Sequence, residues 1–206
     1  MVHAYLAMPR IPLSYRIAEW LIERSTGRRA IVALIVFVVF VATVLPWQAG
    51  IAETYSAGVG SPDRSFWYSA DRLYAFAEAY GADGRAAYVR ARLTFDVVWP
   101  IVYAAMLVLV LGWELRRTTR SGSPWRLVVL LPVAALLADY VENICAAIVM
   151  ARWPETTAVI AHLAPVATAA KWTLLGSAFA LVPVLVVRAL WVTRGGRAGR
   201  AGRGSR

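Results

Sequence analysis

The sequence predicts an all-α integral membrane protein: a four-transmembrane-helix bundle with an outer amphipathic helix and both termini in the cytoplasm. Of its 206 residues, 60% are hydrophobic and only 17% are charged, and the mean hydropathy is +0.58. This composition is typical of membrane proteins rather than soluble ones. Four segments have the length and apolarity of membrane spans, at about residues 30–47, 93–113, 127–150 and 161–191.

The distribution of arginine predicts the orientation of these spans. Residues 1–29, 114–126 and 188–206 hold fifteen arginines and three acids, whereas the loops on the other side hold six of each. Positively charged loops stay in the cytoplasm, so the prediction is N-in/C-in. The net charge of +10 then reflects topology and attraction to membrane lipids, and we expect no nucleic-acid partner. The amino-acid composition is rich in alanine, arginine and valine, which suits a bacterium with a GC-rich genome. We therefore expect the protein to lie in the bacterial cytoplasmic (inner) membrane.

The cytoplasmic N-terminal segment, residues 1–29, is expected to contain an interfacial amphipathic helix within residues 12–26. Its apolar face comprises Leu13, Ile17, Trp20 and Leu21. Such a helix lies on the inner leaflet and positions the span that follows. No clean cleavage site follows the first span, so we expect it to be retained as a signal anchor.

The outer segment, residues 48–92, is predicted to carry a short helix. Ser69 is a suitable N-cap and Gly81 a suitable C-terminal stop. The apolar stripe between them consists of Leu73, Phe76, Ala77 and Tyr80. This segment has two interpretations. It is either an aromatic belt at the level of the lipid headgroups or a lid over a site beneath it.

The second span is expected to be the membrane part of a longer helix that starts near Asp83. Arg92, Asp96 and Tyr103 recur at helical spacing on one face of it. Pro100 removes a backbone hydrogen bond within the span, which predicts a bend near Asp96.

The third span holds the most unusual polar residues of the chain. Asp139, Glu142 and Asn143 are three and four residues apart, so they project from one face of a helix. An ionisable residue inside a span is costly unless it is paired, so it is treated as a functional-site hypothesis. Lys171, the only lysine beside 21 arginines, lies in the fourth span.

Depth along the helices predicts that these groups meet. At ~1.5 Å per residue, Asp96, Glu142 and Lys171 come at a similar level in three different spans. Lys171 is therefore expected to pair with Glu142 or with Asp96. Several carboxyl groups would then share one lysine, which predicts that at least one of Asp96, Asp139 and Glu142 is protonated at neutral pH or that a cation is bound.

These residues form the candidate ligand-binding cluster. Its members are Asp96, Tyr103, Asp139, Glu142, Asn143 and Lys171, with Arg92 and His162 as secondary candidates. No residue is assigned a catalytic role. Neither a metal site nor a cofactor is expected, because zinc-type sites need more nitrogen or sulfur ligands than His162 and the lone Cys145 offer.

Three sequence elements resemble a group of small bacterial four-helix membrane proteins. They are DVVWPIVY at 96–103, which fits D-x-x-x-P-x-x-Y; ADYVEN at 138–143, which fits D-x-x-E-N; and the late lysine of KW at 171–172. The resemblance covers about residues 30–190. It implies the four-helix architecture and carries no activity with it.

Three functions remain open from the sequence. The first is an outward-facing buried polar pocket that binds a small ligand, lipid, amphiphile or cation. The second is a membrane-embedded lipid-modifying enzyme with a carboxylate base and Lys171 as electrophile or counter-ion. The third is a structural or accessory subunit whose polar cluster joins the helices. The membrane domain would be residues 30–191, followed by a disordered Gly/Arg tail at 192–206.

Overall fold

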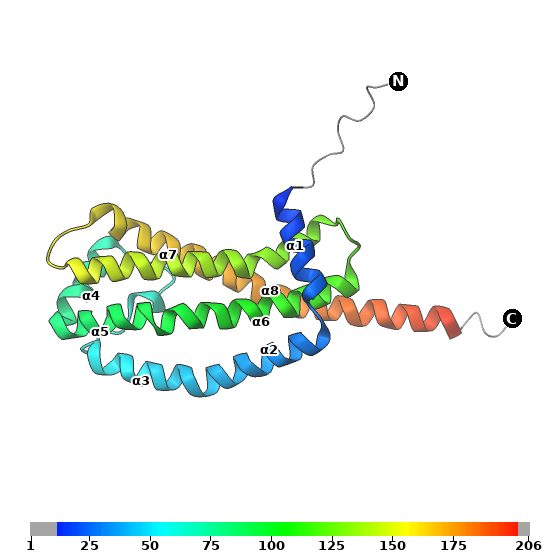
Figure 1. Cartoon of the computed structure of the whole chain (residues 1–206), viewed down its shortest axis with the longest axis horizontal. Coiled ribbons are helices and arrows are strands. Elements are labelled where there is room, and N and C mark those ends of the chain that lie inside the picture. Colours follow the sequence, from blue (N-terminus) through cyan, green and yellow to red (C-terminus); the bar gives the residue numbers. More distant parts are fainter. Residues whose placement is uncertain (1–11, 202–206) are drawn as a thin grey trace, which may run out of the picture.

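Four long helices run side by side, and a shorter helix lies across one end of them (Figure 1). The computed structural model describes the backbone of residues 12–201 and the side chains of residues 12–191. Every regular element in that range is helical. The stretches Gly27–Tyr55, Gly81–Thr118, Pro124–Arg152 and Ala158–Trp191 are long and apolar enough to cross a membrane, as predicted.

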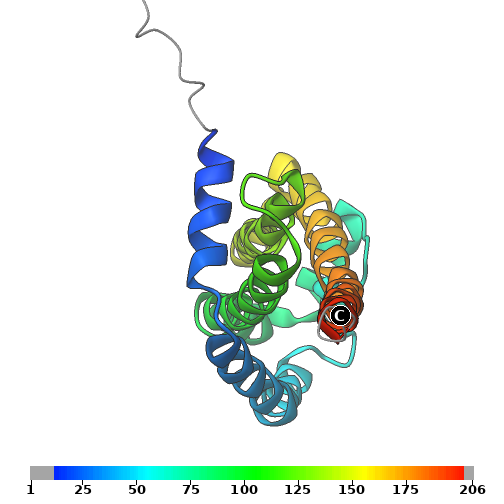
Figure 2. The ribbon, with the colours of Figure 1, turned by 90° about the vertical axis from the view of Figure 1, so that its right-hand side faces the viewer.

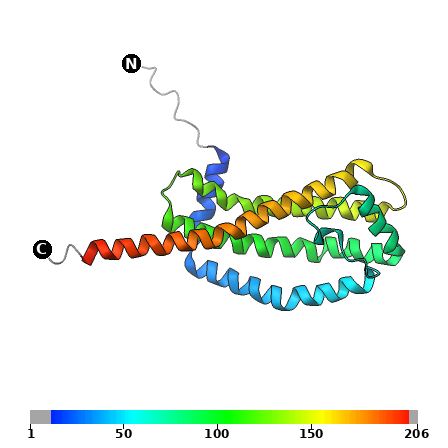
Figure 3. The same cartoon turned by 180° about the vertical axis from the view of Figure 1, so that it is seen from behind.

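The helices have the following bounds. They are α1 Leu13–Arg24, α2 Gly27–Val39, α3 Leu45–Tyr55, α4 Ala70–Ala79, α5 Gly81–Leu93, α6 Phe95–Thr118, α7 Leu131–Arg152 and α8 Ala158–Ala201. We call the end of the bundle with α1 and the C-terminal part of α8 the proximal end, and the end with α4 the distal end (Figures 1 and 3).

The first long helix is a continuous unit made of α2, a π-helical turn at Phe40–Val44, and α3. The turn ends two residues before Pro46, whose ring and missing N–H disturb regular α-helical hydrogen bonding. The helix continues to Tyr55, so it is longer than the predicted span at 30–47. Apolar side chains on several sides of α2 are exposed, including Ile31, Leu34 and Val38.

The second long helix combines α5 and α6. It starts at Gly81, close to the predicted start near Asp83, and is interrupted at Thr94, where φ is −122° and ψ is −78°. This interruption lies two residues before Asp96, near which a bend was predicted. Pro100 lies inside α6, which continues past the predicted end of the span to Thr118.

Helix α1 packs on the proximal end of the bundle, beside α6 (Figure 2). It buries Ala18 and Ile22, which join a core cluster with Leu111 and Leu115 of α6. The apolar face predicted from the sequence is largely exposed, with Leu13 at 67%, Ile17 at 42% and Trp20 at 51%. The bundle covers only the narrow Ala18–Ile22 side, which leaves the broad apolar face free.

Helix α4 covers the distal end of α7 and α8. Ser69 caps it by accepting a hydrogen bond from the Arg72 N–H at 3.1 Å, and Gly81 with φ +65° follows its end, as predicted. The predicted apolar stripe is buried: Leu73, Phe76, Ala77 and Tyr80. It packs in one core cluster with Tyr88, Val149 and Met150.

Helix α8 extends beyond the predicted fourth span. It remains helical to Ala201, within the stretch 192–206 for which disorder was expected, while residues 202–206 lie outside the described range. No proline follows Pro183 in this helix, so nothing sterically ends it sooner.

Candidate functional site

Lys171 of α8 pairs with two carboxyl groups of α7. Its Nζ lies 2.5 Å from Glu142 Oε2 and 3.6 Å from Asp139 Oδ1. All three residues are buried, with exposed fractions of 5%, 1% and 5% for Lys171, Glu142 and Asp139. The three-residue spacing of the two acids puts both on the α7 face that meets α8. Of the two expected partners of Lys171, Glu142 is in contact, whereas Asp96 pairs with Arg92.

Asp139 is also held by two neutral donors. The Tyr103 hydroxyl of α6 donates to Asp139 Oδ2 at 2.9 Å, and Asn143 Nδ2 donates to Asp139 Oδ1 at 3.0 Å. Both donors are buried. Hydrogen bonds and the nearby ammonium group together satisfy a carboxyl group that burial alone would strongly destabilise in its charged form.

Arg92, a secondary candidate in the sequence, connects most of the other members. Its guanidinium donates to Asn143 Oδ1 at 3.0 Å and pairs with Asp96 at 3.1 Å and Asp63 at 3.2 Å. It also lies over the Tyr88 ring, 4.3 Å from the centroid. A planar group with five donors can hold several acceptors at once, which a lysine at this position would not do.

Asp63 and its neighbour Ser61 also contact Arg92, and the sequence predicted neither of them as a site residue. Asp63 lies in the short 3-10 helix Pro62–Arg64 between α3 and α4. Ser61 donates to its carboxylate, and the Trp172 indole N–H donates to its backbone carbonyl at 3.3 Å. Burial would raise the pKa of Asp63, but Arg92, Lys171 and Ser61 outweigh it and hold that pKa well below its usual range.

We call this connected set the polar network. It comprises Ser61, Asp63, Arg92, Asp96, Tyr103, Asp139, Glu142, Asn143 and Lys171. Four carboxyl groups thus share two basic side chains. The prediction that a proton or a bound cation offsets this excess therefore remains in place, and its basis is broader than the sequence indicated.

A cavity of about 250 Å³ opens beside one part of the network, between α3, the 61–64 segment, α5 and α6. Its wall includes Tyr55, Ser61, Asp63, Arg92, Asp96 and Trp99. Lys171, Glu142 and Asp139 do not line it. The network therefore has a cavity-lining part around Asp96 and an inner part around Lys171.

His162 does not join the network. It is exposed on α8, and its Nδ1 lies 2.7 Å from the Ala158 carbonyl of its own helix. Across the described range, no group of three or more His, Cys, Asp or Glu residues is arranged to hold a metal ion. His162 can be explained by a local contact within the first turns of α8.

Fold and site together define an all-helical bundle that has four helices apolar and long enough to cross a membrane and buries a charged network between them. Comparison of the chain with family models, with curated proteins and with solved structures finds no match.

Proposed function

We propose that this protein is a multi-pass protein of the bacterial cytoplasmic membrane, with both termini in the cytoplasm. We further propose that the cavity lined by Asp96 binds a small ligand that carries a positively charged group. Membrane insertion is supported by the exposed apolar side chains along α2, which water would not favour. The orientation is supported by the excess of arginine in residues 1–29, 114–126 and 188–206.

The state of Asp96 carries the binding proposal. Its carboxyl group lines the cavity and is 13% exposed. Among the described residues its only polar partner is Arg92, which Asp63 and Asn143 also engage. Only Oδ2 of Asp96 contacts Arg92, which leaves Oδ1 without a partner among the described residues. A cation bound in the cavity that Asp96 lines would supply that partner.

The rest of the wall favours an organic ammonium group over a bare metal ion. The aromatic residues Trp99 and Tyr55 line the same cavity as the acids Asp96 and Asp63. Rings and carboxylates together are the usual surroundings of alkylated ammonium groups in proteins. Arg64 at the same cavity is exposed, so it can meet a negative group elsewhere in the ligand.

The enzymatic alternative with Lys171 as electrophile is less well supported. Lys171 is buried, engages two carboxyl groups and does not line the cavity. A substrate in the cavity would meet Asp96 and Asp63 instead.

The structural alternative is favoured for the inner part of the network by one observation. Lys171 forms ion pairs with Glu142 and Asp139 between α7 and α8, as polar residues that join membrane helices do. We therefore propose that the inner part holds the bundle together and supports the part that binds.

Binding is tested on the purified full chain in lipid nanodiscs. Isothermal titration calorimetry with choline, tetramethylammonium and sodium chloride should show saturable binding of at least one ammonium probe. Asp96→Asn should weaken that binding by about tenfold or more, as expected for loss of a charge-assisted contact. Glu78→Gln, which changes an exposed acid of α4, is the matched control.

Two outcomes would contradict the binding proposal. One is the absence of saturable binding for every probe. The other is equal affinity in wild type and Asp96→Asn. Orientation is tested separately with reporter fusions after residue 206 and within 56–69: the first should report cytoplasm and the second the opposite side.

A further inference from the structure

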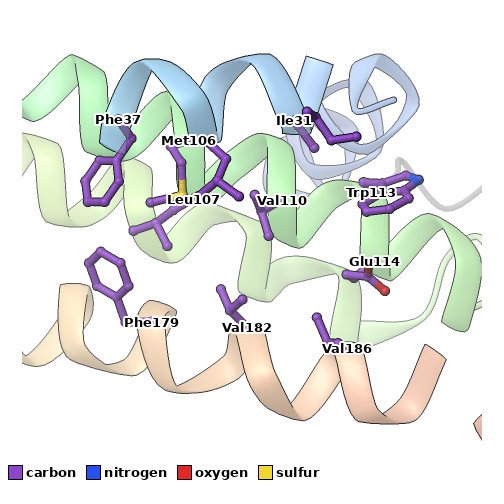
Figure 4. Close-up of a pocket in the computed structure, with 12 residues that line it drawn as sticks. Ile31, Phe37, Met106, Leu107, Val110, Trp113, Glu114, Phe179, Val182 and Val186 are labelled. Atoms are coloured by element: carbon purple, nitrogen blue, oxygen red, sulfur yellow. The ribbon is translucent and has the colours of Figure 1, made fainter. Parts of the chain in front are cut away.

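A second cavity lies in the proximal half of the bundle, between α2, α6 and α8. Its volume is about 320 Å³. Eleven of its twelve lining residues are apolar, among them Phe37, Val110, Phe179 and Val182 (Figure 4). We call it the proximal groove. The exception to its apolar lining is Glu114, which the sequence places in a cytoplasmic loop but which is only 3% exposed.

Glu114 is an unsatisfied acceptor at one end of this groove. Its Oε1 pairs with Arg117 at 3.3 Å, but its buried Oε2 has no hydrogen-bond partner among the described residues. Figure 4 shows its carboxyl group at the same end of the groove as Trp113 and Val186. A buried carboxylate oxygen without a donor is costly, so the site favours an occupant that brings one.

The groove opens toward the surroundings of the bundle. Ile31 and Leu34 on the α2 side are 55% and 45% exposed, and Phe179 and Val186 on the α8 side are 40% and 39% exposed. An apolar cavity with exposed apolar edges is accessible from the side, where an inserted protein meets acyl chains. From Leu107 to Glu114 the α6 wall rises ~10 Å, which is room for part of one chain rather than two.

Two basic residues lie at the same end. Arg117 pairs with Glu114 and lies over the ring of Trp113, 4.7 Å from its centroid. Arg188, exposed on α8 just beyond Val186, donates to the Thr118 carbonyl at the end of α6 at 3.2 Å. Two arginines beside one carboxylate match a headgroup that carries both a phosphate and a hydrogen-bond-donating cation.

We infer that the proximal groove is a lipid site, in which a phospholipid with a primary-ammonium headgroup places one acyl chain between α2, α6 and α8. Its ammonium group donates to Glu114 Oε2, and its phosphate lies beside Arg117 and Arg188. This site is separate from the Asp96 cavity, so it holds or fails independently of the ligand proposed there.

Native mass spectrometry of the full chain tests this inference. The delipidated protein is titrated with three phospholipids that share their acyl chains and differ in headgroup: ethanolamine, choline and glycerol. Ethanolamine should bind about tenfold more tightly than the others, because choline has no N–H to donate and glycerol has no positive charge. Glu114→Gln should remove this preference, while Glu23→Gln, at an exposed acid of α1, should retain it.

A second pair of variants tests the chain position and does not depend on Glu114. Val182→Phe fills the groove and should reduce the binding of all three lipids, whereas Val184→Phe, at a site 60% exposed on the same helix and outside the lining, should not. Equal binding of the three headgroups by wild type would overturn the inference. So would an unchanged ethanolamine preference in Glu114→Gln, or undiminished binding by Val182→Phe.

Discussion

Arg92 of α5 donates a hydrogen bond of 3.0 Å to Asn143 of α7, and this single contact joins the cavity-lining part of the polar network to its inner part. Asn143 in turn donates a hydrogen bond to Asp139, whose carboxyl group forms an ion pair with Lys171. Helices α5, α6, α7 and α8 and the 61–64 segment therefore share one connected set of hydrogen bonds and ion pairs. A change at either part is expected to alter the other.

Replacing Asn143 by leucine should uncouple the two parts. The change keeps the approximate volume but removes a donor to Asp139 and an acceptor for Arg92. We expect a loss of about 1–3 kcal/mol in unfolding free energy, because two buried partners each lose a hydrogen bond. Unfolding in mixed detergent, followed by tryptophan fluorescence, measures it. A variant as stable as wild type would show that water replaces both contacts.

Lys171 and Glu142 should contribute unequally to stability. Lys171→Met leaves two buried carboxyl groups without their cation, so we expect a loss of about 3–5 kcal/mol. Glu142→Gln leaves Lys171 near Asp139 and should cost less. The double variant should regain part of the loss of Lys171→Met, measured in the same unfolding assay. Equal losses in the two single variants would argue against sharing of Lys171 between both acids.

Asp63 should make stability depend on pH on the acidic side. Its folded-state pKa lies below the unfolded value of about 3.9, because Arg92, Lys171 and Ser61 outweigh burial. Its contribution is therefore complete above the unfolded pKa and is lost as pH falls through the folded one. Melting temperatures from pH 7 to 3 should fall less steeply in Asp63→Asn than in wild type. Glu53→Gln, an exposed acid at the same end, should follow wild type.

Gly112 should be essential for the docking of α1. A Cβ at this position would lie 2.8 Å from Ser25 Cβ, closer than side chains pack. We expect Gly112→Ala to cost about 1–3 kcal/mol through overpacking. Gly176 in α8 has no atom within 4 Å of such a Cβ, so Gly176→Ala should be neutral or stabilising by up to ~1 kcal/mol. Thermal unfolding of both variants provides the comparison; a tolerated Gly112→Ala would mean that α1 shifts at little cost.

The architecture was predictable because long apolar runs and arginine-rich loops leave few alternatives to a helical bundle. The N-cap at Ser69 and the helix stop at Gly81 were likewise predictable from the sequence. The first depends on an acceptor for a free backbone N–H, and the second on a residue that tolerates positive φ. Contact between Lys171 and Glu142 was predictable for a different reason. Buried charges must pair, and their depths along two helices agree.

The rest of the site depends on chain paths that no periodicity encodes. Asp63 and Arg92 are 29 residues apart in the sequence. They meet because the segment between α3 and α4 folds back over the bundle. Glu114 follows the last apolar residues of its span, which is why it was counted with the loop charges. It is buried because α6 continues to Thr118. Both depend on tertiary arrangement rather than on local pattern.

Because the helix is interrupted at Thr94, the Arg92–Asp96 ion pair connects two separate helices, α5 and α6. In an unbroken helix, residues four apart keep a fixed spacing, but here one charge ends α5 and the other begins α6. Any pivoting of α5 against α6 changes the separation of guanidinium and carboxylate. A ligand that competes with Arg92 for Asp96 would therefore act at the interruption between the two helices. The angle between α5 and α6 is then expected to differ between the empty and the occupied cavity.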